Sequence, residues 1–435
     1  MRIANKRSDM GVAALARAVK ADSFRMVSLS AAVRNAALHA IAKALRLHSD
    51  AIFAANEADL AAGELDGLPA PIMKRLRFDD KKLREAEAGI AELIALPDPL
   101  FRTLLHRELD EGLILRQISC PIGVIGVIFE SRPDALIQIA TLCLKSGNCT
   151  ILKGGSEAAH TNKALFDIIL EAGVGAGLPS GFLILAETRA DVNELLACHE
   201  SIDLLIPRGS NEFVRYIMDN SSIPVMGHSD GICHIYADES ADVEKAVPII
   251  RDAKTQYAAV CNAAETLLVH RGAAARLLPP VFADLRACGV TVKGCPKTRM
   301  LLPEVLPATD EDFATEYLDY ILSVKIVDSL DEAIAHINRY GSHHTDAILT
   351  EDDAAAERFM LLVDSAGVYR NCSTRFADGF RYGFGAEVGV STGKLHARGP
   401  VGLSGLVTYK YELHGNGQIV GDYAEGRRSF HFRDL

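Results

Sequence analysis

The sequence lacks the marks of several protein classes. Its nine cysteines are dispersed without a C-x-x-C pair, so neither a disulfide framework nor a zinc site is expected. No apolar run approaches the roughly 18 residues of a transmembrane helix. The N-terminus carries Arg2, Lys6, Arg7 and Asp9 instead of a signal peptide's apolar segment, and a basic amphipathic presequence is the alternative there. We therefore expect reduced thiols, no metal and a cytoplasmic location.

The sequence also has no excess of basic over acidic residues. The formal net charge is -11, which argues against a broad nucleic-acid surface because such surfaces need clustered lysine and arginine. The 435 residues are 49% hydrophobic and 24% charged. A globular protein of two or three domains with substantial cores is expected from these values.

Segments with helical periodicity alternate along the chain with segments typical of strands. Apolar residues at three- and four-residue spacing predict helical packing regions over 29–55 and 82–96, and 111–117 is typical of a strand. Further strands are predicted at 122–129, 149–152, 182–185, 202–206, 234–237, 266–269 and 321–327, with helices at 133–146, 157–172, 191–198, 243–254 and 330–338. This alternation predicts an α/β fold with parallel sheets, which bind ligands beyond the carboxyl ends of their strands.

The glycine-rich segments do not match the usual dinucleotide fingerprint. Glycines at 173, 175, 177 and 181 fail the G-x-G-x-x-G spacing. A better candidate is the end of the strand at 149–152, where Lys153, Gly154, Gly155 and Ser156 precede a helix that Ser156 would cap. Their amides and ammonium suit a nucleotide's ribose or phosphate, and the alternative is a helix cap beside a solvated lysine. Gly209 and Ser210 repeat this arrangement one βα unit later.

Cys261 is the candidate nucleophile. It stands with Asn262 between small residues and an apolar strand-like run, a setting that can hold a sulfur on a tight connection facing a cleft. The alternative is a small buried hydrophobic residue, the usual role of a free cysteine.

Residues 371–405 form a long glycine-rich stretch with little hydrophobic periodicity. Such stretches inside a compact domain are usually functional. The cations of this stretch, Arg375, Lys394, His396 and Arg398, suggest recognition of a carboxylate or phosphate, the alternative being solvated surface loops.

Several motifs together resemble one family. They are PIGVIGVIFESRPD at 121–134, LKGGSEA at 152–158, VCN at 260–262, NCSTRFADG at 371–379 and GVSTGKLHARGPVG at 389–402. On these motifs the chain closely resembles the γ-glutamyl phosphate reductases (glutamate-5-semialdehyde dehydrogenases) of the aldehyde dehydrogenase superfamily. The segment GHSDGICH at 227–234 is similar to the reductase half of Δ1-pyrroline-5-carboxylate synthases, so a separate glutamate 5-kinase is an expected partner.

The resemblance implies an aldehyde dehydrogenase-like architecture. A parallel-sheet cofactor domain would span 1–235 and include a hairpin strand near 111–120. An α/β catalytic domain would span 236–405, and 406–435 would supply a C-terminal oligomerisation strand and tail. A dimer or tetramer is expected.

The resemblance also implies NADPH-dependent reduction of L-glutamyl 5-phosphate to glutamate 5-semialdehyde in proline synthesis, through a thioester on Cys261. Ser131 stands where hydrolytic relatives carry an oxyanion-binding Asn. Ser156 replaces the Glu of many NAD-preferring relatives, which favours NADP with Lys153 as a phosphate partner. Glu316 matches the superfamily's Glu at the nicotinamide ribose.

Substrate binding is expected from Arg132, Arg375, His396 and Arg398 near the phosphate and α-carboxylate, and from Asp378 near the α-ammonium. Two other hypotheses are a thiol-dependent aldehyde oxidiser and a catalytically silent nucleotide-binding protein. The segment at 228–230 offers His, Ser and Asp where oxidising relatives carry a general-base Glu, which argues against oxidation.

Overall fold

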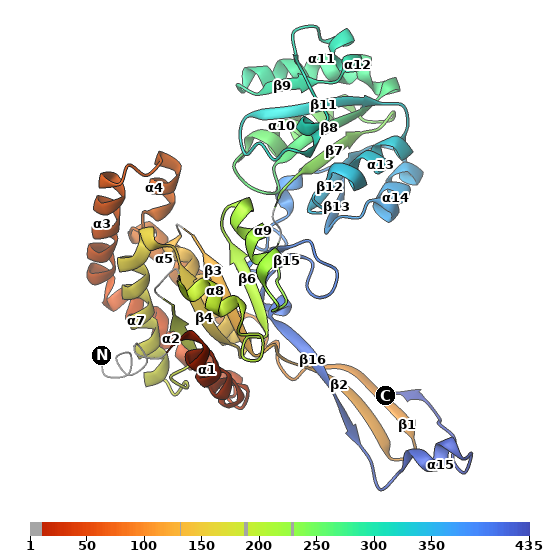
Figure 1. Cartoon of the computed structure of the whole chain (residues 1–435). Helices are drawn as coiled ribbons and strands as arrows, with labels where there is room; N and C mark the ends of the chain where they lie inside the picture. The colour runs from red at the N-terminus through yellow and green to blue at the C-terminus, as the bar shows by residue number, and fades with distance from the viewer. Residues whose placement is uncertain (1–10, 131, 187–189, 228–229) are drawn as a thin grey trace.

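The computed structural model describes residues 11–130, 132–186, 190–227 and 230–435. These residues form two α/β bodies and an antiparallel sheet that extends away from both (Figure 1). The predicted α/β class with parallel sheets is confirmed.

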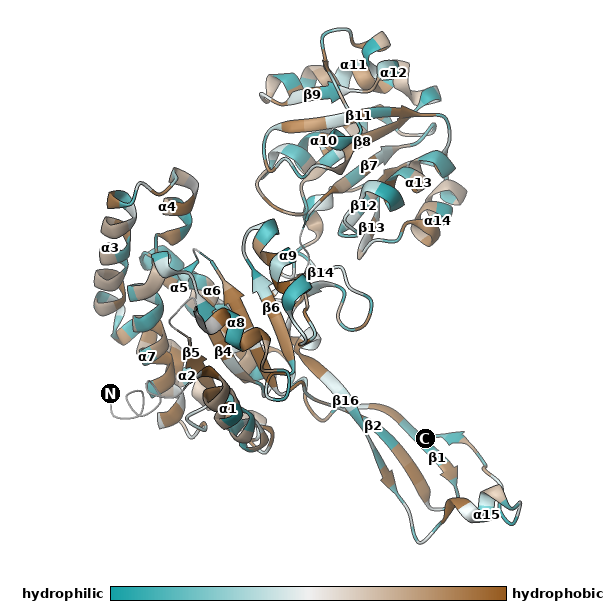
Figure 2. Ribbon diagram, viewed as in Figure 1, coloured by the Kyte–Doolittle hydropathy of each residue, from teal (hydrophilic) through white to brown (hydrophobic). Residues whose placement is uncertain are grey.

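The first body contains a four-stranded parallel sheet of order β5-β4-β3-β6. Its strands are β3 (Val124–Phe129), β4 (Cys149–Gly154), β5 (Leu183–Leu185) and β6 (Leu204–Arg208). β3 and β4 are buried along their whole length, which explains their nearly unbroken apolar sequences. Figure 2 shows hydrophobic residues concentrated on these strands. Because β3 and β6 are neighbouring parallel strands, the segments that follow them lie side by side at the carboxyl ends of the strands.

Helices cover this sheet. They are α1 (Val12–Val27), α2 (Ala31–Leu47), α3 (Ser49–Leu65), α4 (Ala70–Leu76), α5 (Asp80–Ala95), α6 (Pro133–Lys145), α7 (Ala159–Gly175), α8 (Ala190–Leu196) and α9 (Asn211–Asn220). The expected cap by Ser156 is wrong, because a 3-10 turn, η2 (Ser156–Ala158), comes first and α7 begins at Ala159. Asp59 of α3 instead accepts hydrogen bonds from the amides of His160 (3.0 Å) and Thr161 (2.8 Å).

The second body contains a seven-stranded parallel sheet of order β10-β9-β11-β8-β7-β12-β13. The strands are β7 (Cys233–Ala237), β8 (Ala264–His270), β9 (Thr291–Gly294), β10 (Leu306–Pro307), β11 (Ile321–Val327), β12 (Thr345–Leu349) and β13 (Gly367–Arg370). The helices are α10 (Val243–Thr255), α11 (Arg271–Ala287), α12 (Pro296–Leu301), α13 (Leu330–Tyr340) and α14 (Asp353–Leu362), with η3 (Glu311–Ala314) between β10 and β11. The central strands β7 and β8 place the turn before β8 at the edge that faces the first body (Figure 1).

The antiparallel sheet has the order β16-β2-β1-β17. β1 (Thr103–Asp110) and β2 (Leu113–Pro121) form a hairpin, β16 (Val407–His414) pairs with β2 along its whole length, and β17 (Arg433–Asp434) borders β1. A short helix, α15 (Val420–Ala424), lies at the far end of this sheet (Figure 1).

Before it enters β16, the chain returns to the first body. Val388, Val401, Leu403 and Leu406 belong to the same core as β3 and β4. This stretch forms the strand pair β14 (Gly389–Ser391) and β15 (Gly399–Val401), with η4 (Thr374–Phe376) before it and η5 (Leu403–Leu406) after it. Core membership therefore changes near residue 386, earlier than the boundary expected at 405.

Candidate active site

Cys261 lies in the turn between α10 and β8. The amide of Ala263 donates to the carbonyl of Val260 (3.0 Å), which closes the turn around the cysteine. The Cys261 side chain is partly exposed. The turn connects the carboxyl end of α10 to the start of the central strand β8.

Gly231 fixes the backbone of Cys261 from the neighbouring strand. A methyl group built on Gly231 would lie 2.2 Å from both the Cα and the carbonyl oxygen of Cys261. Cys233, two residues later, donates its thiol to that same carbonyl (3.2 Å). The close backbone approach explains why a residue without a side chain stands at position 231.

Asn262 ties the cysteine turn to the segment 371–379. Its side-chain amide donates to the backbone carbonyl of Ala377 (2.8 Å), and the backbone carbonyl of Asn262 accepts from the hydroxyl of Thr374 (2.7 Å). Because this amide nitrogen is already engaged by Ala377, Asn262 acts here as a positioning residue. Ser131, expected near the oxyanion, lies outside the described residues.

Arg208 and Arg132 follow two neighbouring strands of the first body. Arg208 ends β6, and Arg132 is the N-cap residue of α6 just after β3. Both side chains are half-buried. Burial and the neighbouring Arg132 lower the pKa of Arg208 below its usual value, while the charges of Glu387 and Cys261 act to raise it. Sequence reasoning named Arg208 only within the segment 207–210, which repeats the nucleotide-binding arrangement after the strand predicted at 202–206, and did not choose it for the substrate.

Arg375 lies in η4, within the segment 371–379 that Asn262 contacts. Its Nε donates to Oε1 of Gln256 (3.0 Å), which holds the guanidinium in place. Burial and Arg381 lower the pKa of Arg375, and the charges of Cys261 and Asp378 act to raise it. Cys261 therefore interacts electrostatically with one guanidinium from each body.

The remaining predicted substrate residues have local partners. Asp378 accepts hydrogen bonds from the amides of Phe380 (3.0 Å) and Arg381 (3.2 Å). Nε2 of His396 lies 2.9 Å from the carbonyl oxygen of Gly405. Arg398 pairs with the Asp364 carboxylate (3.0 Å). His396 and Arg398 thus fasten the segment 386–406 to its surroundings.

The predicted nucleotide residues lie around β4 and the start of α9. Lys153 is buried and donates to the carbonyl of Gly154 (2.5 Å), whereas Ser156 is exposed. A methyl group on Gly155 would lie 2.1 Å from Oε1 of Glu157, so this carboxylate covers the glycine.

Glu130 occupies the N-terminus of α9. Its carboxylate accepts from the Ser210 amide (3.0 Å) and would lie 2.6 Å from a methyl group on Gly209. A carboxylate at a helix N-terminus marks a position that favours an anion.

Glu316 joins the two bodies. Its Oε2 accepts from the side-chain amide of Asn211 (2.5 Å) at the start of α9, and the same amide lies 3.2 Å from Oδ1 of Asp230. α9 lies between the bodies in Figure 1. The residue expected at the nicotinamide ribose therefore lies beside the segment that leads to Gly231.

A buried ion pair lies near the cysteine turn. Nζ of Lys254, near the end of α10, is 2.6 Å from Oε2 of Glu265 on β8, and both side chains are fully buried. Burial raises the pKa of Glu265 to about 7 and lowers the pKa of Lys254. The pair links the two elements that flank Cys261.

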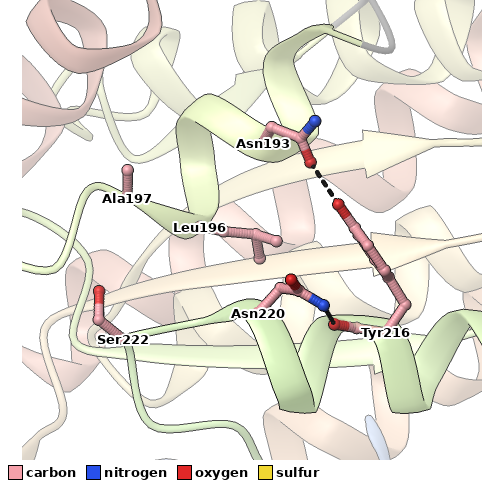
Figure 3. Close-up of a pocket in the computed structure, with 6 residues that line it drawn as sticks. All are labelled: Asn193, Leu196, Ala197, Tyr216, Asn220 and Ser222. Atoms are coloured by element: carbon pink, nitrogen blue, oxygen red, sulfur yellow. Dashed lines mark hydrogen bonds between the residues drawn. The ribbon is translucent and has the colours of Figure 1, made fainter.

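A surface depression between α8 and α9 has a volume of about 370 Å³ (Figure 3). The hydroxyl of Tyr216 donates to Oδ1 of Asn193 across it (3.0 Å). None of the predicted site residues lines this depression.

No group of three or more His, Cys, Asp or Glu residues in the described ranges is arranged to hold a metal ion. No helix in those ranges combines the length and apolarity needed to cross a membrane.

Comparison with known proteins places this geometry in a family. The aldehyde dehydrogenase family model matches residues 2–300. A γ-glutamyl phosphate reductase from Ruminiclostridium cellulolyticum is 60% identical over 94% of each chain, and one from Pelotomaculum thermopropionicum is 59% identical over 97% of each.

Solved structures agree with these sequences. The crystal structure of a γ-glutamyl phosphate reductase from Thermotoga maritima superposes with a TM-score of 0.92 at 40% identity, covering 94% of this chain and 99% of that one. An acetylating aldehyde dehydrogenase from Geobacillus thermoglucosidasius shares the fold at 18% identity, with a TM-score of 0.63 over 94% and 97% of the two chains. The chain belongs to the γ-glutamyl phosphate reductase branch of the aldehyde dehydrogenase family.

Proposed function

We propose that this chain reduces L-glutamyl 5-phosphate to L-glutamate 5-semialdehyde with NADPH, releasing phosphate, as a step of proline biosynthesis. The observation that carries the proposal is a partly exposed Cys261 whose backbone is fixed by Gly231 and Asn262. The names of the similar proteins support the substrate, since they are γ-glutamyl phosphate reductases.

The thiol supplies the first chemical step. The thiolate is the reactive form of a cysteine. The Cys261 sulfur attacks the acyl carbon, the bond from that carbon to the phosphate oxygen breaks, and a thioester remains. The developing charge on the carbonyl oxygen needs preorganised donors, for which we propose the Cys261 amide and Ser131.

We assign the first body to the cofactor. NADPH, when bound, supplies the hydride that reduces the thioester to the aldehyde. Lys153, beside an exposed Ser156 in place of a carboxylate, suits the 2′-phosphate. Gly209 and Ser210 would receive a phosphate where the Glu130 carboxylate now lies, and Glu316 would contact the nicotinamide ribose.

We assign substrate recognition to the cations around the cysteine. Arg132 and Arg375 are the predicted residues best placed for the anionic groups, and Asp378 would receive the α-ammonium. His396 and Arg398 would act mainly by holding the segment 386–406, because Gly405 and Asp364 already engage them.

We further propose a homo-oligomer built through the antiparallel sheet. A separate glutamate 5-kinase would supply the acyl phosphate, because the proposed reaction begins with an activated carboxyl group. All nine cysteines are free, which suits a cytoplasmic enzyme.

The reverse reaction provides the test. We expect NADP reduction with glutamate 5-semialdehyde to require inorganic phosphate and to disappear in Cys261→Ala. Turnover of the wild type without phosphate would indicate hydrolytic aldehyde oxidation instead. Full activity of Cys261→Ala would exclude Cys261 as the nucleophile.

A further inference from the structure

Two arginines project from adjacent strand ends of the first body. β3 and β6 are paired in parallel, Phe129 is the register partner of Arg208, and the Glu130 amide donates to the Arg208 carbonyl (3.0 Å). Arg132 follows two residues later at the start of α6. The carboxyl ends of parallel strands are where such sheets bind ligands.

These two guanidinium groups differ from the other cations of the site. Neither Arg132 nor Arg208 has a hydrogen bond or an ion pair with another side chain in the ranges that the structure describes. Arg375 is held by Gln256, and Arg398 by Asp364. The charges of Glu387 and Asp134 act to raise the pKa of Arg208, but the two half-buried guanidinium groups still repel each other, and an anion bound between them would relieve that repulsion.

A short series of residues connects Arg208 to the cysteine turn. Asn211, three residues after Arg208, hydrogen-bonds to Asp230 (3.2 Å). Asp230 precedes Gly231, which touches the backbone of Cys261. These contacts bring the end of β6 close to the cysteine turn.

We propose that Arg208, together with Arg132, forms the subsite that binds the phosphoryl group of the acyl phosphate and receives the departing inorganic phosphate. The inference rests on the proposed function. In the attack, the carbon–sulfur bond forms as the carbon–oxygen bond breaks, and the proton of the thiol ends on the phosphate. A guanidinium binds a phosphate dianion through paired charge-assisted hydrogen bonds.

The covalent structure of the substrate indicates that its phosphoryl group, and not its α-carboxylate, binds at Arg208. The phosphoryl group is bonded through one oxygen to the carbon that the sulfur attacks, so it must lie beside Cys261. The α-carboxylate is at the far end of the carbon chain. We therefore assign Arg208 to the phosphoryl end, because Asn211 and Asp230 connect the end of β6 to Gly231 and the cysteine turn.

Phosphate protection of Cys261 tests the subsite without turnover. Iodoacetamide labelling of the Cys261 peptide would be followed by mass spectrometry, with the exposed Cys288 as internal standard and chloride at equal ionic strength as the ion control. We expect inorganic phosphate to slow labelling several-fold in the wild type. Arg208→Gln should lose this protection, and Arg208→Lys should need about ten times more phosphate. Arg358→Gln, which breaks an exposed pair with Asp331, should behave as wild type.

Steady-state kinetics of the reverse reaction give the second readout. Arg208→Gln should raise the KM for phosphate about 10- to 100-fold and leave the KM for the semialdehyde within about two-fold, because one charge-assisted contact is lost. Wild-type protection and an unchanged phosphate KM in Arg208→Gln would overturn the subsite. If that variant does not fold, an unchanged half-protecting concentration in Arg208→Lys would do so. Activity retained in Cys261→Ala would instead overturn the proposed function alone.

Discussion

At the scale of single residues, the position of the proposed nucleophile depends on a glycine that carries no chemistry. Gly231 contacts the Cα and carbonyl of Cys261 so closely that no side chain fits between the two backbones. The choice of Cys261 came from its sequence setting and from the family resemblance, and its catalytic role stays a prediction. The glycine was not predicted, because 30 residues separate positions 231 and 261 and only the pairing of β7 with β8 brings them together.

Gly231→Ala should therefore inactivate the enzyme while preserving the fold. The added methyl group meets backbone atoms at 2.2 Å and must displace the cysteine turn. We expect kcat of the reverse reaction to fall at least about 100-fold, as displacements of about 1 Å commonly cause. Gly89→Ala in α5 is the matched control, because a methyl group there meets no atom within 4 Å. An unchanged kcat in Gly231→Ala would contradict this account.

Ser156 should influence cofactor choice. It is exposed beside the buried Lys153, so a carboxylate there would repel a 2′-phosphate. Ser156→Glu should lower kcat/KM for NADPH about ten-fold or more and leave kcat/KM for NADH nearly unchanged. Ser156→Gln has the same shape without the charge and should keep the wild-type preference. Equal losses in both variants would show that bulk, not charge, is responsible.

At the scale of elements, α10 and β8 are joined by a pair that hydrophobic patterning does not reveal. Lys254 and Glu265 are charged residues in otherwise apolar elements, and both are fully buried. The strands and helices themselves were largely predictable, because buried parallel strands have continuous apolar sequences. The start of α7 was not, because Asp59 of a distant helix provides its cap.

Lys254→Met should strongly destabilise the protein, because it leaves Glu265 buried and unpaired. Removal of one partner of a buried pair typically costs about 3–5 kcal/mol of unfolding free energy. In the double variant Lys254→Met/Glu265→Gln, the carboxylate is gone and most of that stability should return. Urea unfolding of the two single variants and the double variant measures the coupling. Additive losses would contradict a direct interaction between the side chains.

His336 on α13 should make stability depend on pH. Burial, with the neighbouring His234 and Lys325, lowers the pKa of His336 from 6.5 to about 3. Between these values the unfolded chain binds a proton that the folded protein does not, so stability falls as pH decreases below about 6.5. Glu265, whose pKa is raised, acts with the opposite sign between 4.5 and about 7.

Comparison with His336→Gln isolates the His336 contribution, because the Glu265 effect is common to both proteins. Between pH 7 and pH 5, the wild type should lose about 2 kcal/mol more unfolding free energy than the variant. Urea unfolding at the two pH values provides the measurement. An equal pH dependence of the two proteins would show that His336 does not titrate as its burial requires.

At the scale of the whole molecule, pairings between strands that are far apart in the sequence are the features that hydrophobic patterns did not predict. β16 pairs with β2 although nearly the entire second body lies between them in the sequence. Periodicity alone cannot predict such a pairing; the expectation of a hairpin came from resemblance to a family. The return of Val388 and Val401 to the first core escaped prediction because residues 371–405 have little periodicity.

The antiparallel sheet should mediate self-association. β16 is its edge strand, and Tyr409, Tyr411 and Leu413 alternate along one face with 52%, 60% and 57% of their surfaces exposed. A sheet of few strands that extends from the protein with an uncovered apolar face is poorly stable by itself. The same strand on a second copy would cover that face and continue the sheet.

Substitution on this face should therefore reduce the molecular mass in solution. Light scattering after size exclusion should find the wild type as a dimer or larger and Tyr411→Lys/Leu413→Lys as a smaller species. Lys410→Glu, on the opposite face of the same strand, should keep the wild-type mass because the apolar face is intact. A monomeric wild type at micromolar concentration would refute the interface. Because the cysteine turn and both parallel sheets lie outside this sheet, a dissociated variant that still labels at Cys261 would show that assembly and the thiol site are built independently.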